Sequence, residues 1–268
     1  MERLSVLCTT MHQTDFSKFK EMNIRSDVVF SNQCDRDEVM QTQIDGHRVR
    51  MISTTTKGVG RNRTIGLLAA DTEIVLFADD DIVYADDYVE QVLRAFDELP
   101  QADVIAFSLD ITKNGEIVKQ SYNRTRRIHT WNCLRYGACV LAARTKSLLK
   151  ANLSFTTLFG GGSMYGCGED SLFVLDCIRG GLKMYSHSYV LGKCAADVSS
   201  WFTGYHEKFF YDKGAWLGAA FPKTGCLLKH YFVYHFRKET KLSYRECCRL
   251  MKRGQKGYRT LRAWERES

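Results

Sequence analysis

An apolar run that ends in three carboxylates occupies Glu73-Ile74-Val75-Leu76-Phe77-Ala78-Asp79-Asp80-Asp81. A continuous apolar run, without alternating polar residues, is typical of a parallel strand that is covered on both faces. Ligands of open parallel sheets bind beyond the carboxyl ends of the strands. The acidic triplet therefore marks the edge of a sheet where we expect a functional site.

The segments around this run alternate between strand and helix patterns. Strands are predicted at 4–10, 27–32, 48–53, 103–109, 135–142 and 182–191, and helices at 61–70, 85–99 and 169–179. In the first helix Ile65, Leu68 and Ala69 lie at helical spacing, so we expect them to face the core. The alternation predicts an α/β fold with a mostly parallel sheet flanked by helices.

The composition is that of a globular protein, with 268 residues of which 44% are hydrophobic and 26% charged. These values exclude a disordered, collagenous or coiled-coil chain. Ten cysteines without a Cys-x-x-Cys pair argue against a zinc ribbon and favour reduced thiols in the core. No apolar run approaches the roughly 20 residues that span a bilayer, and the N-terminus lacks a signal-peptide pattern. We expect a cytoplasmic protein.

Positive charge is concentrated at the C-terminal end. Residues 201–268 hold 15 Lys and Arg against 6 Asp and Glu, a net charge of +9, whereas the whole chain carries +7. Residues 242–266 predict a helix with one apolar and one basic face, in which Gly254 and Gly257 each cost about 1 kcal/mol. Such a helix either packs on the domain or lies on an anionic membrane surface with Tyr258 and Trp264 at headgroup depth. No motif indicates a nucleic-acid partner.

Three consecutive carboxylates at a strand end repel one another unless a cation lies among them. Oxygen ligands suit Mg²⁺ or Mn²⁺, which usually bridge to substrate phosphates. The alternative is a solvated acidic turn that caps the next helix, although Asp86 and Asp87 are better placed to do so.

Two glycine-containing turns are further candidates. Gly58-Val59-Gly60-Arg61-Asn62 precedes a predicted helix, where backbone amides and Arg61 could hold a phosphate. It matches neither a Walker A loop nor a dinucleotide fingerprint. Gly168-Glu169-Asp170 begins the helix that follows the glycine-rich loop 159–168. Its carboxylates either offset the helix dipole or provide a general base.

The order of these motifs resembles the family 2 glycosyltransferases of GT-A fold, many of which build bacterial capsules, exopolysaccharides and lipopolysaccharides. The similarity covers residues 4–200. It implies a catalytic domain over 1–200, with a nucleotide-sugar-binding half at 1–115 and an acceptor half at 116–200. An aromatic and basic helical extension follows at 201–268.

The resemblance also implies roles for single residues. Asp170 would deprotonate the acceptor hydroxyl, with Glu169 orienting the acceptor or the loop, and Asp81 would bind Mn²⁺ or Mg²⁺. The nucleotide sugar would contact Thr9, Thr10, Asn32, Gly58, Arg61, Asp79 and Asp80. The sequence departs from the family at Asn32, where an acid often contacts uracil, and no histidine follows the last strand in register to bind the metal.

The resemblance thus implies an inverting, metal-dependent transfer of a sugar from a nucleotide-diphosphate donor, with UDP the most frequent nucleotide in the family. The acceptor would be a hydroxyl of a glycan or lipid-linked glycan, and the protein would work on the inner face of the cell membrane. Two alternatives remain open: a sugar-phosphate nucleotidyltransferase, whose longer glycine- and arginine-rich signature is missing from residues 5–13, and a catalytically silent scaffold subunit that binds nucleotide sugars.

Overall fold

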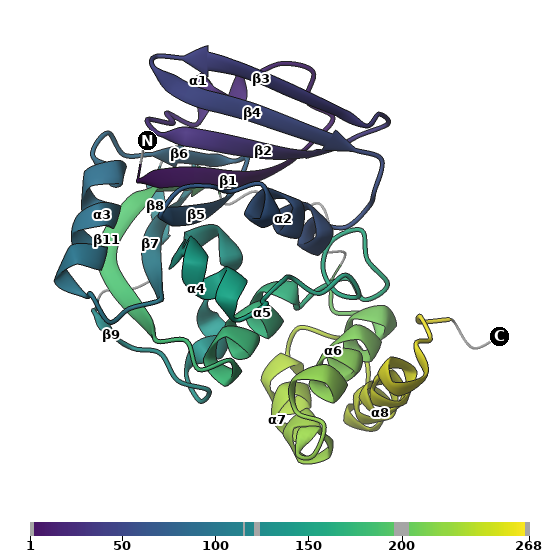
Figure 1. Ribbon diagram of the computed structural model, residues 1–268. Coiled ribbons are helices and arrows are strands. Elements are labelled where there is room, and N and C mark those ends of the chain that lie inside the picture. The colour runs from purple at the N-terminus through teal and green to yellow at the C-terminus, as the bar shows by residue number, and fades with distance from the viewer. Residues whose placement is uncertain (1–2, 115, 121–123, 196–203, 266–268) are drawn as a thin grey trace. The chain divides into compact units, whose positions relative to one another are not determined.

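The computed structural model describes residues 3–114, 116–120, 124–195 and 204–265 (Figure 1). The chain forms two compact units. The first unit comprises Met1–Lys57, Arg61–Phe155 and Phe173–Asp197, and the second comprises Gly58–Gly60, Thr156–Leu172 and Val198–Ser268. The predicted boundary at residue 200 and the aromatic residues Trp201 and Phe202 lie outside the described residues.

The first unit is built on one mixed β-sheet. Its strands are β1 (Leu4–Met11), β2 (Asp27–Gln33), β3 (Glu38–Ile44), β4 (His47–Thr54), β5 (Ile74–Asp79), β6 (Ile82–Tyr84), β7 (Val104–Lys113), β8 (Glu116–Gln120), β9 (Arg126–Arg127), β10 (Leu141–Arg144) and β11 (Met184–Ala195). The strand order is β3-β4-β2-β1-β5-β10-β7-β11-β6, with β8 beside β7 and β9 beside β11. The predicted α/β class is confirmed.

Strand direction divides the sheet into a parallel framework and antiparallel additions. Strands β4, β2, β1 and β5 are parallel neighbours, as are β7 and β11. Strand β10 runs antiparallel between β5 and β7, and β3, β6, β8 and β9 are also antiparallel. The sheet is therefore more mixed than the sequence predicted. The parallel strands β1, β2 and β5 still place their carboxyl ends at one edge.

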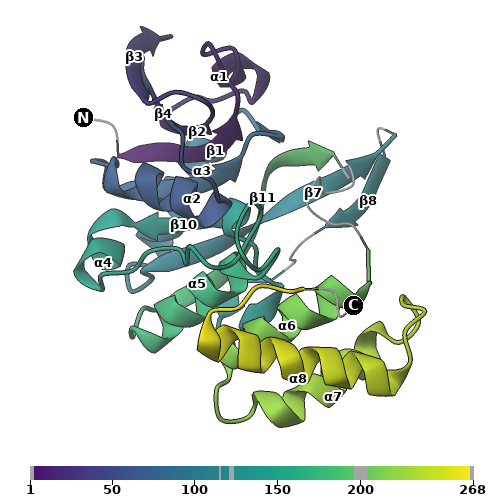
Figure 2. The same ribbon diagram turned by 90° about the vertical axis from the view of Figure 1, so that its right-hand side faces the viewer.

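The helices of this unit lie between the strands in sequence. They are α1 (Lys18–Glu21), α2 (Val59–Leu68, from Arg61 on), α3 (Tyr88–Glu98), α4 (Thr145–Lys150) and α5 (Glu169–Arg179, from Phe173 on), with single 3₁₀ turns at Cys133–Arg135 and Ala138–Val140. Helix α5 packs through Phe173, whose ring stacks on that of Phe155 with 3.9 Å between the ring centres. The Phe173 ring also contacts Phe77 of β5 edge-on. Figure 1 shows α3 beside β11, and Figure 2 shows β7 and β8 side by side.

The face of α2 that packs on the sheet differs from the prediction. Leu68 is 72% exposed, whereas Asn62, Arg63, Gly66 and Leu67 are buried. These four residues share one helical face because positions i, i+1, i+4 and i+5 lie close together around the axis. The expectation that Leu68 faces the core is therefore wrong: polar side chains with partners inside the unit occupy that place.

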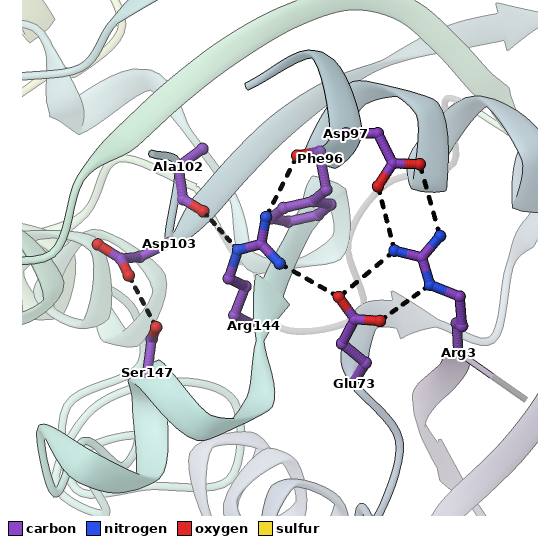
Figure 3. Close-up of polar contacts among 8 residues, drawn as sticks. All are labelled: Arg3, Glu73, Phe96, Asp97, Ala102, Asp103, Arg144 and Ser147. Atoms are coloured by element: carbon purple, nitrogen blue, oxygen red, sulfur yellow. Dashed lines mark hydrogen bonds and ion pairs between the residues drawn. The ribbon is translucent and has the colours of Figure 1, made fainter. Parts of the chain in front are cut away.

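Charged residues link elements at the amino ends of β1 and β5, away from the acidic triplet (Figure 3). Arg3 pairs with Glu73 at 2.9 Å and with Asp97 at 3.1 Å, and Arg144 pairs with Glu73 at 3.2 Å. Hydrogen bonds from Arg3 hold the pKa of Glu73 below its ordinary value of 4.5.

The free energy of unfolding of the Glu73→Gln variant is expected to be lower than that of the wild type by no more than about 1 kcal/mol at neutral pH, because exposed ion pairs contribute little to stability. A carboxylate with a lowered pKa stabilises the folded state above its ordinary pKa, and this contribution disappears as the pH falls through the lowered value. Urea unfolding of both proteins at pH 7 and pH 3 measures the effect. A larger difference at pH 3 than at pH 7 would contradict this account.

The described part of the second unit contains the first residues of α2 and α5 and the whole of α6 (Glu207–Ala220), α7 (Gly225–Phe236) and α8 (Tyr244–Thr260). Helix α8 begins with a capping box in which Ser243 and Glu246 satisfy each other's backbone amides. Helices α6 and α8 cross with their backbones in contact. A Cβ on Gly214 would lie 2.1 Å from the Met251 carbonyl oxygen, and one on Gly254 would lie 1.9 Å from that of Tyr211. Only glycine fits at these two positions.

This crossing decides between the two interpretations of the basic helix. Its apolar residues Cys247, Leu250 and Met251 are buried with Gly254 and Gly257, and α8 packs on α6. The apolar face that the membrane interpretation placed on lipid is therefore inside the unit. The basic residues Arg245, Arg249, Lys252, Lys256 and Arg259 remain exposed. Among the residues that the structure describes, no helix combines the length and apolar character needed to cross a bilayer.

Candidate functional site

The ends of β1 and β5 join the predicted threonine pair to the acidic triplet. Thr9 is opposite Asp79 in the parallel register. The Thr9 hydroxyl donates to Asp79 Oδ1 at 3.0 Å, and the Thr10 hydroxyl donates to Asp80 Oδ2 at 2.5 Å. These bonds fix two carboxylates at the carboxyl edge of the sheet, as expected from the parallel strand order.

A buried arginine that the sequence analysis missed completes this cluster. Arg63 is 4% exposed, and its guanidinium lies 2.9 Å from Asp79 Oδ1 and 5.5 Å from the centre of the Phe155 ring. Arg61, which the sequence analysis selected, is exposed on α2. Arg61 and Arg63 are two positions apart, and side chains at this spacing point about 200° apart around a helix axis. Only one of these arginines can therefore face the sheet. No local sequence pattern identifies Arg63, because its partner Asp79 lies on a separate strand.

Two buried amides hold the strand ends in place. Asn62 donates to the backbone oxygens of Ser31 at 3.2 Å and Thr10 at 3.4 Å. Asn32 is fully buried, accepts from the Gln13 amide at 3.0 Å, and donates to the Gln13 carbonyl at 2.9 Å. The Asn32 side chain thus positions the loop after β1. A direct contact between Asn32 and a nucleotide base would require these bonds to break.

Asp81 differs from the other two carboxylates. It retains solvent-accessible area, yet its pKa is raised, first by desolvation and then by the negative charge of Asp79, with a smaller contribution from Asp80. A raised pKa means that the ionised carboxylate is disfavoured there unless a positive charge compensates it. Among the described residues, no group of three or more His, Cys, Asp or Glu side chains is arranged to hold a metal.

The second unit contains the other predicted site residues, Gly58, Glu169 and Asp170. The glycine-rich loop is bonded to the turn before α2 through the Val59 amide and the Gly161 carbonyl at 3.0 Å. Gly58 has φ +116°, and a Cβ there would lie 3.0 Å from Ser163 Oγ. A Cβ on Gly160, with φ +103°, would lie 2.7 Å from Glu169 Cδ. Glycine therefore lets the Glu169 side chain rest on the loop.

Helix α6 supports the start of α5. Gly168, with φ +112°, lies against the indole of Trp216, where a Cβ would be 2.3 Å from Cδ1. Trp216 Nε1 donates to Ser171 Oγ at 2.9 Å, and the Ser171 hydroxyl donates to the Gly168 carbonyl at 3.1 Å. Glu169 and Asp170, both half-buried, lie between these anchored residues. No pattern in the sequence identified Trp216, because its role depends on a contact 45 residues away.

A buried carboxylate supports the same loop. Asp212, which is 3% exposed, accepts a hydrogen bond from the Gly166 amide at 2.9 Å and pairs with Lys208. Burial raises the pKa of Asp212, while Lys208 and the Gly166 amide lower it. The Tyr165 hydroxyl donates to the Arg262 carbonyl at 3.1 Å. The Asp212 side chain of α6 and the Arg262 backbone carbonyl after α8 thus set the shape of the loop.

Comparisons with known proteins agree with this architecture. The family model described as glycosyl transferase family 2 matches residues 25–154. A crystal structure of S. aureus TarS 1-349 in complex with UDP-GlcNAc has a TM-score of 0.63 at 15% identity, over 98% of this chain and 93% of that one. The mannosyltransferase PcManGT from Pyrobaculum calidifontis, in complex with GDP-Man and Mn²⁺, has a TM-score of 0.52 at 12% identity, over 96% and 86%. A search of curated proteins found no match.

Proposed function

From the family 2 match over residues 25–154 and the GT-A-like fold, we propose that the chain is a family 2 glycosyltransferase that transfers a sugar, with inversion, from a nucleotide-diphosphate donor to a hydroxyl of a glycan or lipid-linked glycan. UDP is the nucleotide we propose first. TarS is described with UDP-GlcNAc and PcManGT with GDP-Man. A GDP-sugar is therefore the first alternative donor to test.

The observation that carries the proposal is the cluster of Thr9, Thr10, Arg63, Asp79 and Asp80 at the carboxyl edge of the sheet. In the proposed complex the donor binds at this edge. Arg61 and the turn at Gly58 contact its diphosphate, and Asp79 and Asp80 contact its ribose and sugar. Arg63 and Asn32 act indirectly, since Arg63 holds Asp79 and Asn32 holds the loop beside the base.

We propose a divalent metal at this edge, and the similar structure of PcManGT is described in complex with Mn²⁺. Asp81 would hold Mn²⁺ or Mg²⁺ with one neighbouring carboxylate, leaving the other positions to diphosphate oxygens and water. This arrangement agrees with the raised pKa of Asp81 and with the lack of a three-residue cluster among the described side chains. When bound, the metal offsets negative charge on the leaving diphosphate.

Asp170 is the proposed general base. It accepts the proton of the acceptor hydroxyl as that oxygen attacks the anomeric carbon from the face opposite the diphosphate, which inverts the configuration. A carboxylate is a weak base, so alignment of the reacting groups must provide much of the rate increase. The anchors at Gly168 and Ser171 provide such alignment by fixing the start of α5. Glu169, resting on Gly160, orients the loop or the acceptor.

The proposed setting is the cytoplasm, at the inner face of the cell membrane, where a lipid-linked acceptor would be available. We also propose that residues 1–115 bind the donor, that residues 116–200 bind the acceptor, and that residues 201–268 form a helical extension.

Calorimetric titration with UDP, GDP and dTDP, each with and without Mn²⁺, tests the donor site. We expect one nucleotide to bind in a metal-dependent way, and Asp81→Asn to weaken this binding at least about tenfold, which corresponds to 1.4 kcal/mol. Asp97→Asn, at the opposite edge of the sheet, is the matched control and should bind like the wild type. Binding without turnover of any sugar donor would favour the scaffold alternative, and no binding at all would refute the donor site.

A further inference from the structure

Helix α7 is apolar in sequence but largely exposed. Of its residues Gly225–Phe236, only Gly225 and Val233 are buried. Leu227, Tyr231 and Tyr234 are 72%, 63% and 61% exposed. Their spacing of four and three residues places them on one face of the helix. Contiguous exposed apolar side chains of this kind mark an interaction surface.

Basic residues flank α7 at both ends. Lys223 precedes α7 and Lys238 follows it, and both are exposed. Arg237 lies over the ring of Tyr234, 3.5 Å from its centre. The described part of the second unit from residue 204 to 265 holds 14 Lys and Arg against 5 Asp and Glu. An apolar helix face with basic residues beside it is complementary to a surface that is both apolar and anionic.

We propose that the face formed by Leu227, Tyr231 and Tyr234 is a docking surface for an anionic lipid bilayer. Tyrosine suits the headgroup region because its ring is apolar and its hydroxyl is polar. The leucine enters the acyl boundary, and Lys223, Arg237 and Lys238 meet lipid phosphates. This proposal deepens the peripheral location proposed above and replaces α8 with α7 as the apolar contact, since the apolar face of α8 is buried.

Co-sedimentation with vesicles tests the docking surface without any sugar donor. The wild type is expected to bind vesicles of phosphatidylcholine with about 30% phosphatidylglycerol at least tenfold more tightly than pure phosphatidylcholine, and high salt should weaken this binding. The Leu227→Ser/Tyr231→Ser variant should lose at least tenfold in affinity. Leu68→Ser is the matched control, because Leu68 is also 72% exposed but lies in the first unit, and it should bind like the wild type.

The outcomes separate this proposal from the proposed reaction. Thermal melting and nucleotide titration of the double variant should match those of the wild type, because both substituted side chains are exposed. The proposal is overturned if the wild type ignores anionic vesicles, or if the double variant binds them equally well. It is also overturned if the exposed face instead pairs two copies of the chain, seen as a concentration-dependent dimer that the double variant abolishes. Vesicle binding by a protein that binds no nucleotide would refute the donor site and leave the docking surface standing.

Discussion

Asp170→Asn, which removes the proposed general base, is expected to lower kcat for sugar transfer by about 10²- to 10⁴-fold and to leave nucleotide affinity unchanged. The amide is nearly the same size as the carboxylate but cannot take the proton from the acceptor hydroxyl. The N-terminus of α5 should keep its geometry, because the substitution leaves the bonds among Gly168, Ser171 and Trp216 in place. Donor turnover and calorimetric nucleotide binding are measured on the same preparation.

Asp176→Asn is the control for this variant. Asp176 lies on the same helix, and its side chain is 48% exposed, so transfer should continue at the wild-type rate. A parallel loss of nucleotide affinity and melting temperature in Asp170→Asn would assign a structural role to Asp170. Full activity would show that another group accepts the proton.

Gly168→Ala destabilises the protein by about 2–4 kcal/mol, because it combines a strained backbone with an overpacked contact. Its φ of +112° is unfavourable for any side chain, and the new Cβ would meet Trp216 Cδ1 at 2.3 Å. The indole is buried, so it cannot move aside freely. Since Glu169 and Asp170 follow directly, transfer activity should also fall. Urea unfolding gives the free energy, and donor turnover gives the activity.

Gly181→Ala separates the two causes. Gly181 has φ +85°, but a Cβ there would have no atom within 4 Å, so this variant carries backbone strain alone and should lose about 1 kcal/mol. Equal losses in the two variants would show that the Trp216 contact contributes nothing. Trp216→Leu makes room at the contact, so combining it with Gly168→Ala should give less than the sum of the two single losses.

The parallel strands could be predicted from the sequence because they are apolar runs with clear ends. The hairpin formed by β3 and β4 was not predicted. Strand β3 alternates exposed and half-buried residues, and such a polar strand carries little hydrophobic signal. Its turn did carry a signal, because Asp45 and Gly46 both have positive φ, as the Asp-Gly pair of a two-residue hairpin turn requires.

Polar packing explains the errors closer to the site. The core face of α2 was assigned from its apolar residues, but Asn62 and Arg63 occupy it because Ser31, Thr10 and Asp79 offer them hydrogen-bond partners. Such partners come from strands that are distant in sequence, so no local pattern shows them. The contacts of Trp216 and Asp212 with the loop are hidden for the same reason.

Gly254 of α8 is unfavourable in an isolated helix but necessary in the folded protein. In an isolated helix Gly254 is a weakness of about 1 kcal/mol relative to alanine. At the crossing with α6 any side chain would collide with the Tyr211 carbonyl. The sequence shows the cost of this glycine but not the approach of the second helix that makes it necessary.

The bond between Tyr165 and Arg262 has a consequence for the order of events during synthesis on the ribosome. The two residues are 97 positions apart, and a translating ribosome adds about 5–20 residues per second. The glycine-rich loop is therefore made roughly 5–20 s before the segment that fixes it is available. The strands β1 to β5 have all their pairing partners much earlier. A nascent chain should thus form its sheet first and fix the glycine-rich loop last, so the proposed activity would appear only after α8 has been added.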